Sequence, residues 1–466
     1  MNRTSTVGAG DTGWTGSWVA QQAGVRLADR SSPLGLTVAD LVGLALRRNW
    51  RRPQLLVSTV LGKHVPTDPR IVYAAGLLLG GQVAYALTDT KPADLASGRL
   101  LREALAGQPG TARALLDHAP APAPALVGKV AVLGYAETAT ALGHAVADAL
   151  PGAVYLHSTR RPVGTATEAG FEEEHSHASS HLLLAEDPQL LTGDVLVLVD
   201  DELSTGRTVL NTVATVHRRH LRRRYVVAAL VDVRSEGDRV GMALRAAELG
   251  VRLDVVALAS GTLTLPPDLP AQAARLLSAH PDVALPTPAS TDGQIDRIVP
   301  TDWPTAVREG GRHGFTSADR RLLKGALREV AVTIAATLTG RRVLVLGFEE
   351  LMYAPLLLAG MLLDLAVTPA LISFSTTTRS PVLAVDEPGY PIRSRLVFPA
   401  HDEPADGPGE RYAYNVTPGA FDHVVVVVDA PADTPQLHAD DGLLAALRAL
   451  EVAVTLVVLP AYTPKW

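Results

Sequence analysis

The stretch Val195-Leu-Val-Leu-Val-Asp-Asp-Glu-Leu-Ser-Thr-Gly-Arg-Thr208 decides how this chain is interpreted. Its opening run of Val and Leu predicts a buried parallel strand, and this run leads into two adjacent carboxylates, Asp200 and Asp201. A Ser-Thr-Gly loop follows, and an amphipathic helix is expected to begin near Thr208. Because open α/β sheets bind ligands where their parallel strands end, the stretch predicts a ligand site.

The loop between the acids and the helix has the features of a phosphate cradle. Gly206 permits a tight turn that gathers backbone N–H groups, and the helix directs its positive end at the same point. The residues whose side chains add donors for phosphate oxygens are Ser204, Thr205, Arg207 and Thr208. Asp200 and Asp201 are placed to accept hydrogen bonds from vicinal ribose hydroxyls. The stretch therefore predicts a ribose-5-phosphate site, with an ordinary strand-to-helix turn as the alternative.

Composition limits the class of protein. The 466 residues are 47% hydrophobic, enough for about two to four folded domains. The net charge of −6 argues against nucleic acid as a partner, and the lack of cysteine excludes disulfides and thiolate chemistry. The N-terminal segment has no apolar core like that of a signal peptide. The apolar runs at 71–87 and 351–367 are interrupted, which favours buried helices, no membrane partner and a cytoplasmic location.

Strand-like and helical segments alternate along the chain. We expect a helix over 36–49 and strands at 55–62, 130–133, 195–199, 226–231 and 253–258. This alternation predicts an α/β fold with a parallel sheet and flanking helices. Residues 284–306 are rich in Pro, Thr, Ser and Asp, which indicates a boundary between domains. The expected organisation is a flexible leader (1–24), a first domain (25–285), a linker (286–309) and a second α/β domain (310–462).

The second domain repeats features of the first in the same order. Three pairs of similar segments carry the repeat: Val130–Glu137 with Val343–Glu350, His157–Val163 with Thr376–Val382, and Val195–Asp201 with Val424–Ala430. In the second copy Asp429 alone replaces the acid pair, and no Ser-Thr-Gly loop follows it. We therefore predict a degenerate duplication whose second copy does not hold ribose phosphate in the same way.

Three further segments could face a pyrophosphate group. The turn Gly134-Tyr-Ala-Glu-Thr138 follows a strand and opens a helix, so it can present backbone amides, although a close-packed structural turn is the alternative. Arg160 ends another strand-like run, and arginine makes forked, charge-assisted bonds to phosphate. Lys63 and His64 follow a glycine and could add positive charge to the same pocket. Exposed or helix-capping basic pairs are the alternative for these cations.

The polar segment Glu172–His181 has two interpretations. If the segment is helical, His177 and His181 share one face, which makes a metal site conceivable. No clear set of carboxylate ligands accompanies these histidines, so we favour a lid over the active site.

With these residues in hand, the chain resembles a bacterial family of phosphoribosyltransferase-like proteins encoded in tellurite-resistance and stress gene clusters. The 195–208 stretch is similar to the signature of type I phosphoribosyltransferases. The family's C-terminal domain is named after a Thr-Arg-Ser-Pro (TRSP) motif, which stands here at Thr378, Arg379, Ser380 and Pro381. The resemblance implies a reaction between a nitrogenous base and phosphoribosyl pyrophosphate (PRPP), in either direction, in the biosynthesis of a nucleoside-like metabolite.

The resemblance also implies roles for the candidate residues. The catalytic candidates are Asp200, Asp201, Arg160 and Glu137. The PRPP-binding candidates are Asp200, Asp201, Ser204, Thr205, Gly206, Arg207, Thr208, Ala136, Glu137, Thr138 and Lys63. Mg²⁺ would arrive with the pyrophosphate, helped by the two aspartates, rather than be held by the protein alone. The turn at 134–138 is expected to contain a non-proline cis peptide.

Several questions stay open at this point. The base, the direction of the reaction and the oligomeric state, including a homo-oligomer, do not follow from the residues. A non-catalytic PRPP sensor or a scaffold protein is the alternative to an enzyme.

Overall fold

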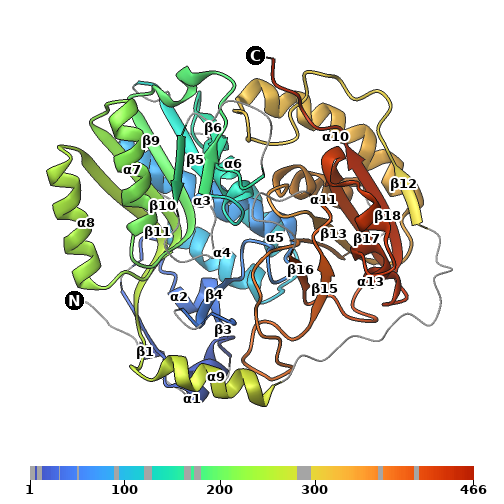
Figure 1. Ribbon diagram of the computed structural model, residues 1–466, viewed down its shortest axis with the longest axis horizontal. Coiled ribbons are helices and arrows are strands. Elements are labelled where there is room, and N and C mark those ends of the chain that lie inside the picture. The colour runs from blue at the N-terminus through green and yellow to red at the C-terminus, as the bar shows by residue number, and fades with distance from the viewer. Residues whose placement is uncertain are drawn as a thin grey trace.

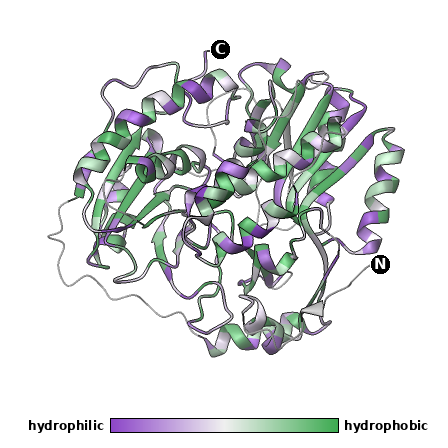
Figure 2. Ribbon diagram, turned by 180° about the vertical axis from the view of Figure 1, so that it is seen from behind, coloured by the Kyte–Doolittle hydropathy of each residue, from purple (hydrophilic) through white to green (hydrophobic). Residues whose placement is uncertain are grey.

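Two α/β units lie side by side in the computed structural model of the chain (Figure 1). The structure describes residues 6–7, 13–30, 32–49, 52–88, 94–119, 128–161, 169–172, 180–280, 295–365, 371–402 and 409–465. Hydrophobic residues concentrate in the strands and on the inner sides of the helices that cover them (Figure 2).

The first unit is built on a seven-stranded sheet with the order β1-β2-β11-β10-β9-β5-β6. Its strands are β1 (Thr6–Val7), β2 (Arg26–Asp29), β5 (Val130–Gly134), β6 (Val154–His157), β9 (Val195–Leu203), β10 (Arg224–Asp232) and β11 (Arg252–Thr264). The five strands from β11 to β6 are parallel, and β1 and β2 add an antiparallel edge. Continuous apolar runs form the central strands because helices cover both faces of the sheet.

Helices divide between the two faces of this sheet. One face carries α3 (Pro69–Thr88) and α6 (Thr140–Asp148), and the other carries α7 (Arg207–Arg219) and α8 (Glu236–Glu248). By length and composition alone α3 could cross a membrane, and among the described helices only α3 meets that test. It packs against α6, β10 and β11, as a core helix of this unit does. The sequence predicted this buried helix but underestimated its length.

The second unit contains a five-stranded parallel sheet with the order β12-β18-β17-β13-β14. Its strands are β12 (Ile295–Ile298), β13 (Arg342–Gly347), β14 (Leu371–Thr376), β17 (His423–Asp429) and β18 (Ala453–Leu459). One face packs on α10 (Ser317–Thr337) and α11 (Tyr353–Leu365). The other face packs on α12 (Pro435–His438), α13 (Leu443–Arg448) and the hairpin β15 (Arg395–Pro399)–β16 (Glu410–Tyr414). The expected second α/β domain is therefore present.

The two sheets share the order of four strands. The order β10-β9-β5-β6 in the first unit corresponds to β18-β17-β13-β14 in the second. In each unit a helix that precedes β5 or β13 in the chain packs on the helix that directly follows that strand, α3 on α6 and α10 on α11. This is the arrangement that the degenerate duplication predicts.

Two sequence predictions near the N-terminus fail. Residues 17–24 are not a flexible leader: α1 (Ser17–Ala23) buries Trp18 and Val19, because these apolar side chains find a surface at β3 (Val42–Leu46). The helix expected over 36–49 is limited to α2 (Val38–Leu41), and β3 then pairs antiparallel with β4 (Gln54–Ser58). All five residues of β3 are buried, so this segment lacks the polar face on which the helical pattern depends.

The linker expected over 286–309 is also too long. Ile295–Ile298 belongs to the second sheet as β12, and Val307 and Glu309 are buried. The remaining described elements are α4 (Leu95–Leu105), α5 (Thr111–His118), β7 (Ala169–Glu172), β8 (Ser180–Leu183), the short 3₁₀ helices at Pro188–Leu191 and Ala430–Ala432, and α9 (Leu269–Ala279).

Candidate active site between the two units

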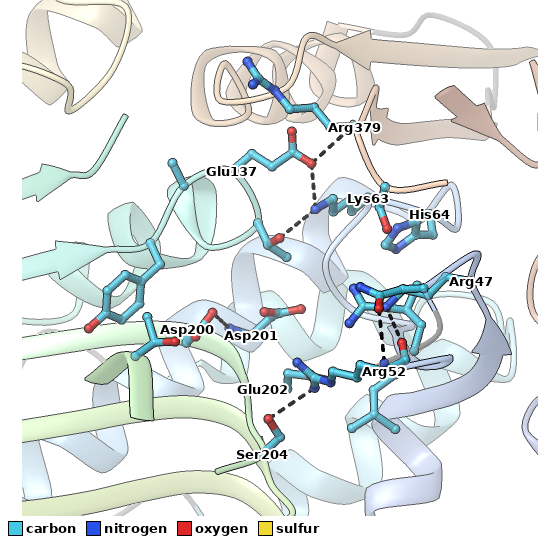
Figure 3. A pocket seen from close by; sticks show the side chains of 18 of the residues that line it. Arg47, Arg52, Lys63, His64, Glu137, Asp200, Asp201, Glu202, Ser204 and Arg379 are labelled. Atoms are coloured by element: carbon cyan, nitrogen blue, oxygen red, sulfur yellow. Dashed lines mark hydrogen bonds and ion pairs between the residues drawn. The ribbon is translucent and has the colours of Figure 1, made fainter. Parts of the chain in front are cut away.

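A pocket of about 490 Å³ opens where β5 and β9 end, and both units line it (Figure 3). Its walls contain the residues predicted from the first unit: Lys63, Ala136, Glu137, Thr138, Arg160, Asp200, Asp201, Ser204, Thr205, Gly206, Arg207 and Thr208. From the second unit come Arg379, Ser380 and Pro381, while Thr378 is buried behind them. One cavity therefore brings together segments that are far apart in the sequence.

The loop after β9 has the expected form. Gly206 has φ +80° and precedes α7, which begins at Arg207, one residue before the predicted start. A Cβ at Gly206 would lie 3.0 Å from the sulfur of Met242, so the position favours glycine by both conformation and space. The N-terminus of α7 and the hydroxyls of Ser204 and Thr205 consequently meet at one corner of the pocket.

The acid pair lies inside β9 rather than after it. Pairing with β10 continues to Leu203, so the strand carries Asp200 and Asp201 into the pocket on its last residues. The backbone N–H of Asp201 donates to Oδ1 of Asp200 at 2.9 Å. Burial, and then the neighbouring Glu202, raise the pKa of the Asp201 carboxyl above its ordinary value of 3.8. The pair thus supplies carboxylate oxygens to the wall of the cavity.

The turn after β5 contains a cis peptide bond between Ala136 and Glu137, as the resemblance implied. The backbone N–H of Ala136 donates to Oγ of Ser158 at 2.9 Å, and this hydroxyl lies 2.8 Å from Nδ1 of His181. The next residue, Thr138, accepts a hydrogen bond from Nζ of Lys63 at 2.7 Å. The turn is therefore held from two sides.

Glu137 is buried but surrounded by donors (Figure 3). One of its carboxylate oxygens lies 2.9 Å from Nζ of Lys63, and the same oxygen accepts from the Thr378 hydroxyl at 2.5 Å. Burial alone would raise the pKa of this carboxyl, but the positive charges of Lys63 and Arg379 and the Thr378 bond lower it to about 2. The carboxylate is thus ionised, and it fixes Lys63 beside the turn.

Sequence reasoning missed a basic wall formed by the segment that joins β3 to β4. Arg47, Arg48 and Arg52 line the pocket, and Arg52 pairs with Glu202 and donates to Oγ of Ser204 at 3.2 Å. The high density of arginine in 47–52 could have indicated an anion site. The helix expected over 36–49 gave no reason to place these arginines at a ligand. Among the described lining residues, eight are Lys or Arg and five are Asp or Glu. The cavity therefore suits a polyanion.

The second unit contributes another group that the sequence did not reveal. Arg411 and Tyr412 of β16 line the pocket beside Arg379. The buried carboxylate of Glu349 joins the two arginines, accepting from Nε of Arg379 at 2.5 Å and from Nε of Arg411. No local motif marks residues 410–412, because their place in the site depends on how the two units pack.

The helix on which the metal interpretation rested is absent around His181. This residue lies in β8, which pairs with β7, and its ring is buried in the pocket wall edge-on to Tyr135. His175, His177 and most of the proposed lid lie outside the described residues. No group of His, Asp or Glu among the described residues has the arrangement of a metal site.

Comparisons with known proteins identify the family. A model described as phosphoribosyl transferase matches residues 41–262, and a model described as the TRSP domain C-terminal to that transferase matches residues 309–447. No curated protein matches the chain. Both domain matches follow the order that the sequence resemblance implied.

Solved structures of adenine phosphoribosyltransferases are similar to part of the chain. The enzyme from Trypanosoma brucei, in complex with AMP, pyrophosphate and ribose-5-phosphate, is 17% identical with a TM-score of 0.21; the match covers 28% of this chain and 56% of that enzyme. The enzyme from Giardia lamblia complexed with 9-deazaadenine is 19% identical with a TM-score of 0.21, over 28% of this chain and 68% of that one. The chain thus spans little more than half of the trypanosome enzyme. By its two successive domain matches, the chain belongs to the family in which a phosphoribosyl transferase domain is followed by a TRSP domain.

Proposed function

We propose that this protein transfers a phosphoribosyl group between PRPP and a nitrogenous base, in one direction or the other. The observation that carries the proposal is the single cavity shared by the Ser204–Thr208 loop, the acid pair and the Ala136–Glu137 turn. These three groups offer the three kinds of contact that PRPP needs: a phosphate cradle, acceptors for ribose hydroxyls, and amides with cations for a pyrophosphate.

In this proposal the 5′-phosphate occupies the loop at the start of α7. Its oxygens accept hydrogen bonds from backbone amides and from the hydroxyls of Ser204, Thr205 and Thr208. Asp200 and Asp201 accept from the two ribose hydroxyls and so fix the ring. The pyrophosphate then points toward the 136–138 turn, where Lys63 and Arg160 add positive charge.

The expected chemistry depends on positioning and charge. As the bond from C1 to pyrophosphate lengthens, positive charge grows at the sugar ring and negative charge grows on the leaving group. The carboxylates of Asp200 and Asp201 stabilise the ring charge, and the cations stabilise the leaving group. A fixed ribose also keeps C1 in line between the base and the leaving oxygen, which lowers the entropic cost of reaction.

Mg²⁺ fits the site as a partner of the pyrophosphate. The carboxylate oxygens of Asp200 and Asp201 face the cavity and are ligands that Mg²⁺ accepts, alongside phosphate oxygens and water. When bound, the ion would neutralise charge on the leaving group. We propose that the product is nucleoside-like and belongs to a tellurite- or stress-resistance pathway, on the ground of the sequence resemblance.

The test is release of pyrophosphate from PRPP with Mg²⁺ and a panel of bases. Wild-type protein should release pyrophosphate with at least one base, and Asp200→Asn/Asp201→Asn should not. Calorimetry on the same proteins measures PRPP affinity. Tight PRPP binding without turnover on any base would support the sensor instead, and no PRPP binding would refute both.

A further inference from the structure

The two units exchange contacts through equivalent residues. Glu137, after β5, accepts from the Thr378 hydroxyl at 2.5 Å and from the backbone N–H of Arg379 at 3.4 Å. Glu350, after β13, accepts from the Thr159 hydroxyl at 2.6 Å and from the backbone N–H of Arg160 at 2.7 Å. Each unit's turn glutamate therefore holds the Thr-Arg pair that follows a strand of the other unit.

Both glutamates are built to stay ionised. Glu137 and Glu350 are buried, which by itself raises the pKa of a carboxyl. In Glu350 the nearby Arg312 and His157, with the two hydrogen bonds, reverse this effect and lower the pKa to about 2. A buried carboxylate that stays charged makes strong, charge-assisted hydrogen bonds. The two Thr-Arg pairs are therefore held firmly across the boundary between the units.

In the second unit, arginine side chains lie on the carboxylate that corresponds to the acid pair. At the second site Asp429 replaces the acid pair, and Nη1 of Arg161 lies 2.5 Å from its carboxylate. Arg312 lies 3.8 Å from the same carboxylate and 3.5 Å from that of Glu350. The cavity that borders Arg312 and Glu350 is about 10 Å³, room for roughly one water, against about 490 Å³ in the first site. The second unit thus gives residues to a site rather than offering one.

Two arginines held in this way line the open pocket beside the 134–138 turn. That turn carries no basic side chain of its own, so its cations come from elsewhere in the fold. Lys63 comes from the same unit and Arg379 from the other, and Figure 3 shows the Lys63 ammonium and the Arg379 backbone meeting at the Glu137 carboxylate. Nε of Arg379 is fixed by Glu349 at 2.5 Å. The guanidinium is thereby oriented before any ligand arrives.

We propose that the C-terminal domain completes the pyrophosphate end of the pocket. Arg379 contacts the pyrophosphate directly, and Glu350 is a positioning residue that places Arg160 for a second contact. This inference rests on the proposed function and adds to it: the phosphoribosyl transferase domain lacks part of its leaving-group site without the domain that follows it. The residues proposed for the ribose-5-phosphate end, Asp200, Asp201 and Ser204–Thr208, all belong to the first unit, so binding there should not depend on the C-terminal domain.

The experiment compares two ligands in calorimetry on the full chain: pyrophosphate with Mg²⁺, and ribose 5-phosphate. Arg379→Ala should weaken pyrophosphate binding by about 10- to 100-fold, as expected for losing hydrogen bonds to a charged group. Ribose 5-phosphate binding should stay within about twofold. Arg393→Ala is the matched control, because this C-terminal arginine is exposed, pairs with Asp386 and lies outside the pocket lining.

The positioning role of Glu350 is tested through its partner. Thr159→Val removes the hydroxyl that donates to Glu350, without leaving a charge unpaired. It should weaken pyrophosphate binding by about tenfold. Thr159→Ser restores the hydroxyl and should restore affinity, a rescue that a change in packing alone would not give. Glu350→Gln should act in the same direction as Thr159→Val.

The outcomes separate the two proposals. If wild-type protein binds neither ligand, the proposed function fails and this inference fails with it. If wild-type protein binds both ligands and Arg379→Ala and Thr159→Val bind pyrophosphate normally, the inference alone is overturned. Equal weakening of both ligands would also overturn it, because the C-terminal domain would then be supporting the whole pocket.

Discussion

The ion pair between Glu137 and Lys63 gives the sharpest quantitative prediction. Both side chains are about 7% exposed, and their charged atoms are 2.9 Å apart. Glu137→Gln keeps the shape and an acceptor for Thr378 but leaves the Lys63 ammonium buried without its counter-charge. Breaking a buried pair from one side costs about 3–5 kcal/mol. The lowering of the Glu137 pKa from 4.5 to about 2 corresponds to a similar figure, about 3 kcal/mol.

The assay is urea unfolding of a set of variants at pH 7. Glu137→Gln should lose about 3 kcal/mol of unfolding free energy. Lys63→Met should also lower the unfolding free energy. The double variant should lose about 2–3 kcal/mol less than the sum of the two single losses, because it leaves no unpaired charge. Additive losses in the double variant would refute the view that this pair holds the turn. Glu387→Gln, at an exposed position, is the control and should change stability by less than about 0.5 kcal/mol.

The same pair predicts a pH dependence. Because the folded-state pKa of Glu137 is lowered, its contribution is complete above pH 4.5 and is lost as the pH falls through about 2. The difference in unfolding free energy between wild type and Glu137→Gln should therefore be constant from pH 7 to about pH 5. It should shrink steadily below pH 4.5. A difference that grows on acidification would contradict the assignment of an ionised Glu137.

Three other substitutions test separate parts of the site. Asp200→Asn/Asp201→Asn should weaken PRPP binding by about 100-fold or more, since two charge-assisted bonds to ribose are lost. The thermal unfolding midpoint should change little, and unchanged PRPP affinity in calorimetry would refute the ribose assignment. Gly206→Val should reduce ribose 5-phosphate affinity at least about tenfold, because a β-branched residue resists φ +80°, and a crystal structure with the loop unchanged would contradict this reasoning. Arg161→Met should cost about 3–5 kcal/mol in urea unfolding, because buried Asp429 loses its nearest cation and keeps Arg312 at 3.8 Å, yet it should spare ribose 5-phosphate binding. A loss of that binding would argue against a second site that is separate from the first.

The first unit's sheet and the phosphate loop were predictable from the sequence because their information is local. A run of Val and Leu before Asp200, and Gly206 before a helix, define the strand, the turn and the helix start within a few residues. The same holds for the order of segments in the second domain, where the strand before Asp429 has an equally continuous apolar run. Burial on both sides of a sheet produces such runs wherever the strand lies in the chain.

Prediction failed where local pattern and tertiary packing disagree. Leu41, Leu44 and Leu46 suggested a helical face, but Val42–Leu46 is buried on every side and pairs as a strand. The contact of Glu350 with Arg160 was equally hidden, because the two residues are 190 positions apart in the chain. Contacts at such separations depend on how the two folded units pack against each other. Hydrophobic periodicity predicts local helices and strands but not this packing.

The contact between Glu137 and Thr378 spans 241 residues of chain, which sets an order of events during synthesis. At about 5–20 residues per second, the turn that holds Glu137 leaves the ribosome roughly 10–50 s before the hydroxyl that completes it. For that interval the Glu137 carboxylate has the first unit's Lys63 and Arg160 near it, but not Thr378 or Arg379. If the C-terminal domain completes the pyrophosphate end as proposed, the pocket is completed only after that domain has been synthesised and has packed against the first unit.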